Sequence, residues 1–242
     1  MRRFVPALRA ACLPAALALA CAWPVCPASA QTAPSACGNP FVNGYGPYDY
    51  RTANSDQKHL VESYHFTPNV EALVRGQTGV FVGGDIDYTL RVFPNHHRAL
   101  IAMMKLGEKL KLPQAPGTPF TVECYFERAI AFRPDDGIAR MIYAKYLSSS
   151  GRKEDAARQL EIAAAAATDS GFTHYNIGLI YLEMGETDKA LAAAQKAQQL
   201  GFMRDELKGR LVAAGKWVDP PPPAAAASAP AGSAPAASAP AQ

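Results

Sequence analysis

The chain has 242 residues, of which 49% are apolar and 19% charged, so it has enough apolar sequence to form one or two domains with a buried core. Its formal net charge is only +3. This small excess argues against nucleic-acid binding, which needs a basic surface that displaces counterions.

The first thirty residues have the pattern of a secretory signal. Three arginines in the first nine residues give a basic start, residues 10–20 are apolar apart from one proline, and small residues occupy positions 28–30. We expect cleavage after Ala30, which places the mature chain in the periplasm or outside the cell, without an integral membrane span. A minor alternative is a lipoprotein anchored through Cys21, although the preceding run Leu17-Ala18-Leu19-Ala20 has a bulky leucine where that signal expects a small residue.

Removal of this segment changes the charge and the cysteine count. The 24 basic residues less three arginines leave 21, which match the 21 acidic ones, so nucleic acid is not an expected partner. Of the five cysteines, only Cys37 and Cys124 remain. An oxidising compartment and an even pair predict a disulfide between them, and the alternative is a buried free Cys124.

Two segments of the chain repeat each other with a period of 34 residues. His174, Ile177-Gly178, Tyr181, Gly185 and Ala190 in one segment correspond to Arg140, Tyr143-Ala144, Leu147, Gly151 and Ala156 in the other. This pattern resembles the tetratricopeptide repeat (TPR), a unit of two antiparallel helices. Small residues let the helices approach, and a glycine follows the first helix of each unit, where a left-handed backbone is favoured.

The resemblance covers residues 94 to 217 and implies an all-α, TPR-type solenoid. The expected organisation is as follows: signal peptide 1–30, irregular N-terminal arm 31–66, degenerate helical unit 67–93, stretched TPR unit 94–136, TPR units 137–170 and 171–204, capping helix 205–218, and a Pro/Ala-rich tail 219–242 that is predicted to be disordered. Within the degenerate unit we expect helices over 68–75 and 85–93, with Asp85 as the N-cap of the second.

In the TPR family the first helix of each unit lines the concave face, and residues one turn apart point into it together. The resemblance therefore predicts a partner-binding groove. Its expected residues are Arg98, Ile101 and Lys105 in the stretched unit, Ile138, Met141 and Lys145 in the next, and Phe172, Tyr175, Asn176 and Leu179 in the third. Basic residues at one end suit an acidic side chain or a C-terminal carboxylate, and the alternative is that the arm or the final helix covers the row.

Other candidate chemistry has simpler interpretations. His96 and His97 are adjacent and point about 100° apart on a helix, so helix-start and surface roles are favoured over a metal site. Glu62, Asp85 and Asp87 could form a carboxylate cluster, but no nucleophile or base accompanies them in a recognisable spacing. The aromatic residues of the arm could form a recognition surface, and packing onto the helices is the favoured alternative: Phe41, Tyr45, Tyr48, Tyr50 and Tyr64.

The sequence thus predicts a periplasmic interaction scaffold that binds a peptide or a partner domain through its concave groove. It predicts no cofactor, no metal and no catalytic residue. The alternatives are a structural accessory subunit of an envelope secretion or polysaccharide machine and, from another class, an enzyme with a site in residues 37–93. The fold alone does not choose a ligand.

Overall fold

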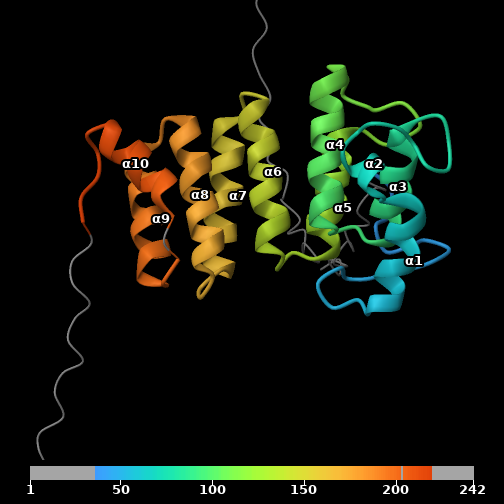
Figure 1. The fold of residues 1–242 in the computed structure, drawn as a ribbon, viewed down its shortest axis with the longest axis horizontal. Helices are drawn as coiled ribbons and strands as arrows, with labels where there is room; N and C mark the ends of the chain where they lie inside the picture. Colours follow the sequence, from blue (N-terminus) through green and yellow to red (C-terminus); the bar gives the residue numbers. More distant parts are fainter. Residues whose placement is uncertain (1–35, 203, 220–242) are drawn as a thin grey trace, which may run out of the picture. The chain divides into compact units, whose positions relative to one another are not determined.

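The structure, a computed structural model, describes residues 36–202 and 204–219, so the expected signal peptide and nearly all of the tail lie outside it. The described residues are helical and contain no strand. Figure 1 shows the helices, which are α1 (Ser55–His65), α2 (Pro68–Glu71), α3 (Val82–Val92), α4 (His97–Leu110), α5 (Val122–Phe132), α6 (Gly137–Ser149), α7 (Lys153–Ala166), α8 (Gly171–Met184), α9 (Thr187–Gln199) and α10 (Asp205–Ala213).

Helices α6 and α7, and likewise α8 and α9, form two closely packed antiparallel pairs, as expected for the two 34-residue units. A Cβ atom placed on Gly178 would lie 2.5 Å from a methyl carbon of Leu207 and 3.3 Å from the carbonyl oxygen of Ala190, so α8 has no room for a side chain there. The turns use Gly151 and Gly185 at φ of 79° and 85°, a conformation that glycine adopts without steric cost. The described part of the chain is therefore a TPR-like helical solenoid.

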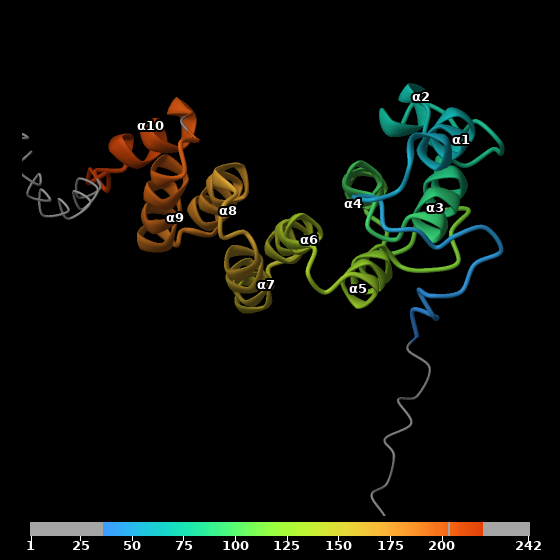
Figure 2. The same cartoon turned by 90° about the horizontal axis from the view of Figure 1, so that it is seen from below.

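The first helices of successive pairs contact one another, α4 with α6, α6 with α8, and α8 with α10. Figure 2 shows α6 between α4 and α8, with α5 and α7 on the other side of this row. These contacts place one face of α4, α6 and α8 on a common surface.

The N-terminal region differs from the expectation in three ways. The arm is not wholly irregular, because α1 begins at Ser55 behind a reciprocal cap in which Asn54 and Gln57 each accept from the other's backbone N–H. The helix expected over 68–75 ends at Glu71 and is followed by Leu73 at a left-handed φ of 57°. Asp85 is not an N-cap, because α3 begins three residues earlier, at Val82.

The aromatic residues of the arm separate into two groups. Tyr45, Tyr48 and Tyr50 pack around a small core that contains Phe93, and the Tyr50 and Phe93 ring centroids lie 5.6 Å apart. Packing is therefore the role of these three tyrosines. Tyr64 remains 61% exposed. Phe41 is 55% exposed and touches one ring, that of Phe132.

The predicted disulfide is present. It joins Cys37 to Cys124 with Cα atoms 5.0 Å apart, across a sequence separation of 87 residues. Arg128 Nη1 also donates to the Cys37 carbonyl at 2.9 Å. Together these bonds fix the start of the arm to α5.

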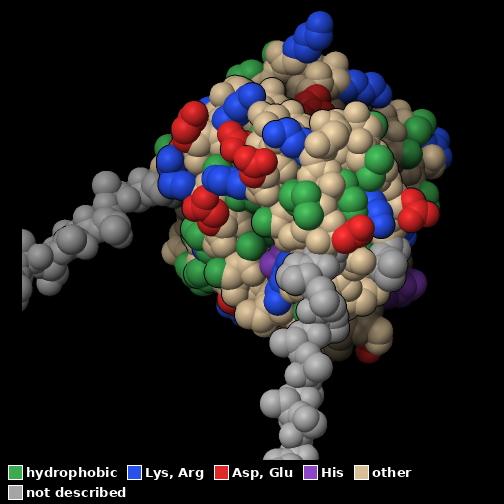
Figure 3. All heavy atoms as spheres, turned by 90° about the vertical axis from the view of Figure 1, so that its left-hand side faces the viewer, with side chains coloured by type: hydrophobic (Ala, Val, Ile, Leu, Met, Phe, Trp, Pro, Cys, Tyr) green, Lys and Arg blue, Asp and Glu red, His purple; other side chains and the backbone are tan. Residues whose placement is uncertain are grey.

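Helix α10 covers the end of the last pair by burying Leu207 and Leu211, which are 1% and 0% exposed. Figure 3 views this end of the molecule and shows Lys, Arg, Asp and Glu side chains interspersed over it. A polar outer face on the terminal helix is what a solenoid needs for solubility. Among the described residues, no helix has both the length and the apolar character needed to cross a bilayer.

Candidate interaction groove

A hollow of about 240 Å³ lies on the surface that α4, α6 and α8 share. Each helix contributes residues one turn apart, because positions i, i+3, i+4 and i+7 fall on one face of a helix. The lining residues are Ile101 and Met104 from α4, Met141, Ile142 and Lys145 from α6, and Asn176, Leu179, Ile180 and Glu183 from α8.

The floor of this groove is apolar and its rim is polar. Met104, Met141, Ile142 and Ile180 are between 5% and 8% exposed, whereas Ile101 and Leu179 are half-buried and reach further towards solvent. At the rim, Lys145 forms an ion pair with Glu183, which joins α6 to α8. The groove therefore offers apolar contact area beside one internally compensated pair of charges.

The groove brings together five of the predicted residues, namely Ile101, Met141, Lys145, Asn176 and Leu179. Asn176, which is partly exposed, donates from its side-chain amide to the carbonyl of Phe172 at 2.8 Å. The sequence reasoning missed Met104, Ile142, Ile180 and Glu183, although each stands three or four residues from a predicted position on the same helix.

Tyr175 and Phe172 do not belong to this groove. The Tyr175 ring is 6% exposed and lies against Phe202, its hydroxyl is 3.4 Å from Glu206 of α10, and it lines a separate small pocket at the C-terminal end. Phe172 packs edge-on against Phe202 and stays half-exposed. The final helix thus covers this end of the predicted row. Ile138 packs against the core instead of lining the hollow.

The three basic residues expected at one end of the groove have other neighbours. Arg98 forms a two-point pair with Glu71 of α2, and this hydrogen bond raises the pKa of Arg98 and lowers that of Glu71. Lys145 is paired with Glu183, so two of the three predicted cations are already compensated. Lys105 is exposed on α4 but does not line the hollow. The geometry therefore does not favour a carboxylate ligand.

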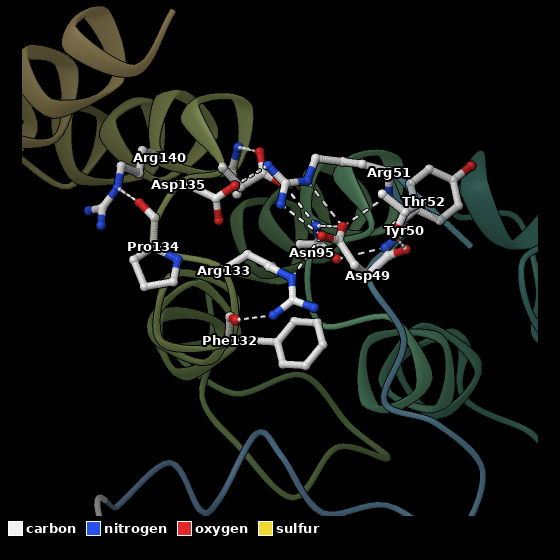
Figure 4. Close-up of polar contacts among 12 residues, drawn as sticks. Asp49, Tyr50, Arg51, Thr52, Asn95, Phe132, Arg133, Pro134, Asp135 and Arg140 are labelled. Carbon is white, nitrogen blue, oxygen red and sulfur yellow. Dashed lines mark hydrogen bonds and ion pairs between the residues drawn. The ribbon is translucent and has the colours of Figure 1, made fainter.

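A buried polar network at the junction of α4 and α6 joins two of the three helices that form the groove. The Asn95 amide nitrogen donates to Asp49 at 2.7 Å and to Asp136 at 2.8 Å, and Asn95 is fully buried. Figure 4 shows the guanidinium groups of Arg51 and Arg133 beside Asp49, to which they donate at 2.7 Å.

The network lowers the pKa of both carboxylates. Burial alone would raise the pKa of Asp49, but the hydrogen bonds from Arg51, Asn95 and Arg133 outweigh it and lower the pKa. Burial likewise opposes ionisation of Asp136, whose pKa is lowered by the hydrogen bond from His97 at 2.9 Å. Asp136 also caps α6 by accepting from Ala139 N–H. His97 and Asp136 therefore connect the start of α4 to the start of α6.

The three carboxylates that could have formed a cluster are each hydrogen-bonded by neighbouring groups. Glu62 accepts from Tyr50 and His96, Asp85 accepts from Thr78 and the backbone of Gln77, and Asp87 accepts from Tyr125 and Arg91. In residues 36–202 and 204–219 the one group with metal-ligand spacing is Cys37, Cys124 and Glu127. The disulfide already occupies both of its sulfurs.

No family model matches this sequence, and no curated protein matches it. Among solved structures, the chain is similar to one described as "Crystal structure of MamA", with 18% identity over 50% of this chain and 67% of that chain and a TM-score of 0.36. A second, described as "MamA MSR-1 C2", shares 18% identity over 64% of this chain and 80% of that one, with a TM-score of 0.38. The TPR-like description of the fold rests on the helix pairs of this chain and not on these distant similarities.

Proposed function

We propose that this protein is an interaction scaffold that binds a segment of a partner protein in the groove formed by α4, α6 and α8. The observation that carries the proposal is the shared apolar floor. Three helices from successive units contribute residues to one hollow, and half-buried Ile101 and Leu179 extend it towards solvent. Contiguous apolar surface in a concave site is typical of a place where another molecule binds.

The chemistry of the groove selects the kind of segment it accepts. Met104 and Met141 are adaptable thioether side chains, and they lie beside branched aliphatic residues that suit apolar anchors. Because Lys145 and Glu183 neutralise each other, an occupant gains little from net charge. The preferred occupant is an amphipathic helix or extended peptide that places two or three apolar side chains on the floor. Its polar backbone or side-chain donors can reach Asn176.

The lining residues also favour binding over catalysis. The polar side chains of the hollow are those of Lys145, Asn176 and Glu183, and they contain no nucleophile held by a base. An enzyme site in residues 37–93 is likewise not favoured, because Glu62, Asp85 and Asp87 are each engaged by neighbours that stabilise the fold. We therefore assign the groove a recognition role.

A crosslinking experiment tests the proposal inside the cell. A photoreactive amino acid at Leu179 should form a covalent adduct with one defined protein, whereas the same group at Ile162, which is 45% exposed on α7, should not. With the identified partner, Leu179→Glu should weaken binding about thirtyfold, as expected for an apolar anchor worth roughly 2 kcal/mol. Ile162→Glu is the matched control. Equal adducts at both positions, or unchanged affinity of Leu179→Glu, would move the binding site elsewhere.

We further propose that the scaffold acts in the cell envelope, after export and cleavage behind Ala30. The sequence pattern of residues 1–30 and the Cys37–Cys124 disulfide support this location, because disulfides persist in oxidising compartments. Intact-mass analysis of the periplasmic fraction should give a chain that starts at Gln31. Recovery of the uncleaved chain from the cytoplasm would contradict the export proposal without touching the groove.

A further inference from the structure

The end of the molecule at the C-terminus of α4 carries exposed apolar residues that the groove does not use. They are Val74, Val80 and Phe81 from the connection between α2 and α3, and Leu110 and Leu112 from the end of α4 and the segment after it. Figure 1 shows both connecting segments at this end of α4. Val80 is 90% exposed, and the other four residues are between 41% and 69% exposed.

The two segments are in direct contact. Val80, Phe81 and Leu110 line one hollow of about 310 Å³, together with Lys109. Lys109 Nζ also donates to the carbonyl of Leu73 at 3.2 Å, which ties the end of α4 to the turn before Val74. Val80, Phe81 and Leu110 therefore form one patch, here called the α4-end patch, and Val74 and Leu112 are exposed on the same two segments.

The structure holds the outer segment of this patch in place. Asp85, which is 1% exposed, accepts from the backbone N–H of Gln77 at 2.7 Å and of Thr78 at 3.2 Å. His65 Nδ1 lies 3.1 Å from the same carboxylate. A buried carboxylate is costly unless it is fully hydrogen-bonded, and here it orders the segment whose tip exposes Val80 and Phe81. The fold thus uses buried polar groups to present apolar residues to solvent.

Three basic residues lie on the two segments that form the patch. Arg75, Lys109 and Lys111 are exposed within or beside it, whereas Glu108 is the one carboxylate on the last turn of α4. In the described part of the chain, Arg75 and Lys111 form no ion pair with a carboxylate, in contrast to Arg98 and Lys145 of the groove region. The patch therefore combines protruding apolar side chains with uncompensated positive charge.

We propose that the α4-end patch binds the surface of an anionic phospholipid bilayer. Val80 and Phe81 would enter the boundary between headgroups and acyl chains, and Arg75, Lys109 and Lys111 would contact lipid phosphates. Shallow apolar insertion beside lysine and arginine is the chemistry by which peripheral proteins hold such surfaces. The charge of the patch selects an anionic surface over a neutral one. This assignment goes beyond the groove, and the two surfaces together would place a bound partner next to a membrane.

Vesicle flotation tests the proposal with the full chain. Vesicles of phosphatidylcholine mixed with phosphatidylglycerol should carry the protein upward, vesicles of phosphatidylcholine alone should carry much less, and added salt should weaken the binding. Residues 1–30 contain three arginines and an apolar run that can bind vesicles themselves, so every variant is compared in the same form of the chain, where this segment contributes equally.

Two variants and two controls isolate the patch. Val80→Asp with Phe81→Ser should abolish the difference in protein binding between the two vesicle types. Lys109→Gln with Lys111→Asn should weaken binding to anionic vesicles about thirtyfold, because each cation near the surface contributes roughly a factor of five. Ile162→Asp and Lys216→Gln should bind like wild type. Unchanged thermal unfolding shows that the patch variants are folded. Equal binding to both vesicle types, or wild-type binding of folded patch variants, would overturn the proposal. The proposal would also be overturned if the wild type binds no vesicles but binds a protein partner that the Val80→Asp, Phe81→Ser variant no longer binds.

Discussion

His96 Nε2 lies 3.1 Å from Glu62 Oε1, while the Nδ1 atom of the same ring accepts the N–H of Ala99 at 3.1 Å and caps α4. Both bonds are satisfied by one neutral tautomer, with the proton on Nε2. Protonation of Nδ1 would remove the acceptor that caps the helix. The fully buried ring therefore connects α1 to the start of α4 only while it stays uncharged.

This arrangement predicts that acid destabilises the protein through His96. Burial lowers the pKa of His96 below its ordinary value of 6.5, so the unfolded chain binds a proton that the folded chain does not. Stability is full above pH 6.5 and is lost progressively as the pH falls from 6.5 towards the folded pKa. Glu62, whose pKa falls to about 2 through the hydrogen bond from His96, adds a second loss only below about pH 4.5.

Thermal unfolding between pH 5 and 7.5 measures this dependence. His96→Asn keeps an acceptor at the N-cap and removes the titrating ring, so its melting temperature should vary less with pH than that of the wild type. His59→Asn, at an exposed position of α1, is the matched control and should retain the wild-type slope. Parallel slopes for all three proteins would rule out His96 as the sensor.

The second prediction concerns Asn95, which separates the carboxylates of Asp49 and Asp136. Asn95→Ala removes a donor from each of these buried groups, and the free energy of unfolding should fall by about 2–3 kcal/mol. Asp135→Asn removes the side chain that is 68% exposed beside Arg51, and its effect should stay below about 1 kcal/mol. Urea denaturation of both variants gives the comparison. A loss at Asn95 no larger than that at Asp135 would show that the network adds little.

The third prediction concerns the disulfide. Cys37→Ser with Cys124→Ser opens a loop of 87 residues and should lower the free energy of unfolding by about 4–5 kcal/mol, the upper value of the chain-entropy model. Urea denaturation in reductant should bring the wild type to the same midpoint. Non-reducing peptide mapping of periplasmic protein should recover the two cysteines in one linked peptide pair. Recovery as separate free-thiol peptides would contradict the bond.

The fourth prediction compares two helical glycines. Gly178→Ala would place its Cβ atom 2.5 Å from a carbon of buried Leu207, so overpacking should cost about 1–3 kcal/mol. Gly209 has open space around it on α10, and Gly209→Ala should stabilise the protein by about 0.5–1 kcal/mol because alanine favours a helix. Chemical denaturation of the pair measures the contrast. A neutral Gly178→Ala would mean that α10 moves aside easily.

The sequence by itself determined the helix pairs of residues 137–199, because their information is local. Small residues such as Ala144 and Gly178 recur at a fixed period, Gly151 and Gly185 end the first helices, and one helical face follows from positions one turn apart. The cysteine count predicted the disulfide in a similar way: in the expected mature chain, Cys124 is the one other cysteine available to Cys37. The same periodicity grouped Ile101, Met141 and Leu179, which line one hollow in the structure.

Only the tertiary structure determined which residues contact each of these helix faces. Glu71 and Glu183, the partners of Arg98 and Lys145, are 27 and 38 residues away on other helices, so no local sequence pattern predicts these pairs. Tyr175 lies outside the groove because its ring packs at the C-terminal end, with its hydroxyl 3.4 Å from Glu206 of α10. Asp85 is not an N-cap because α3 begins at Val82, and its carboxylate accepts instead from the backbone N–H of Thr78. Hydrogen bonds and ion pairs depend on distances of about 3 Å between side chains, which the packing of whole helices sets. The periodicity of the sequence therefore predicts which residues share one face of a helix, and the tertiary structure determines which residues pack against that face.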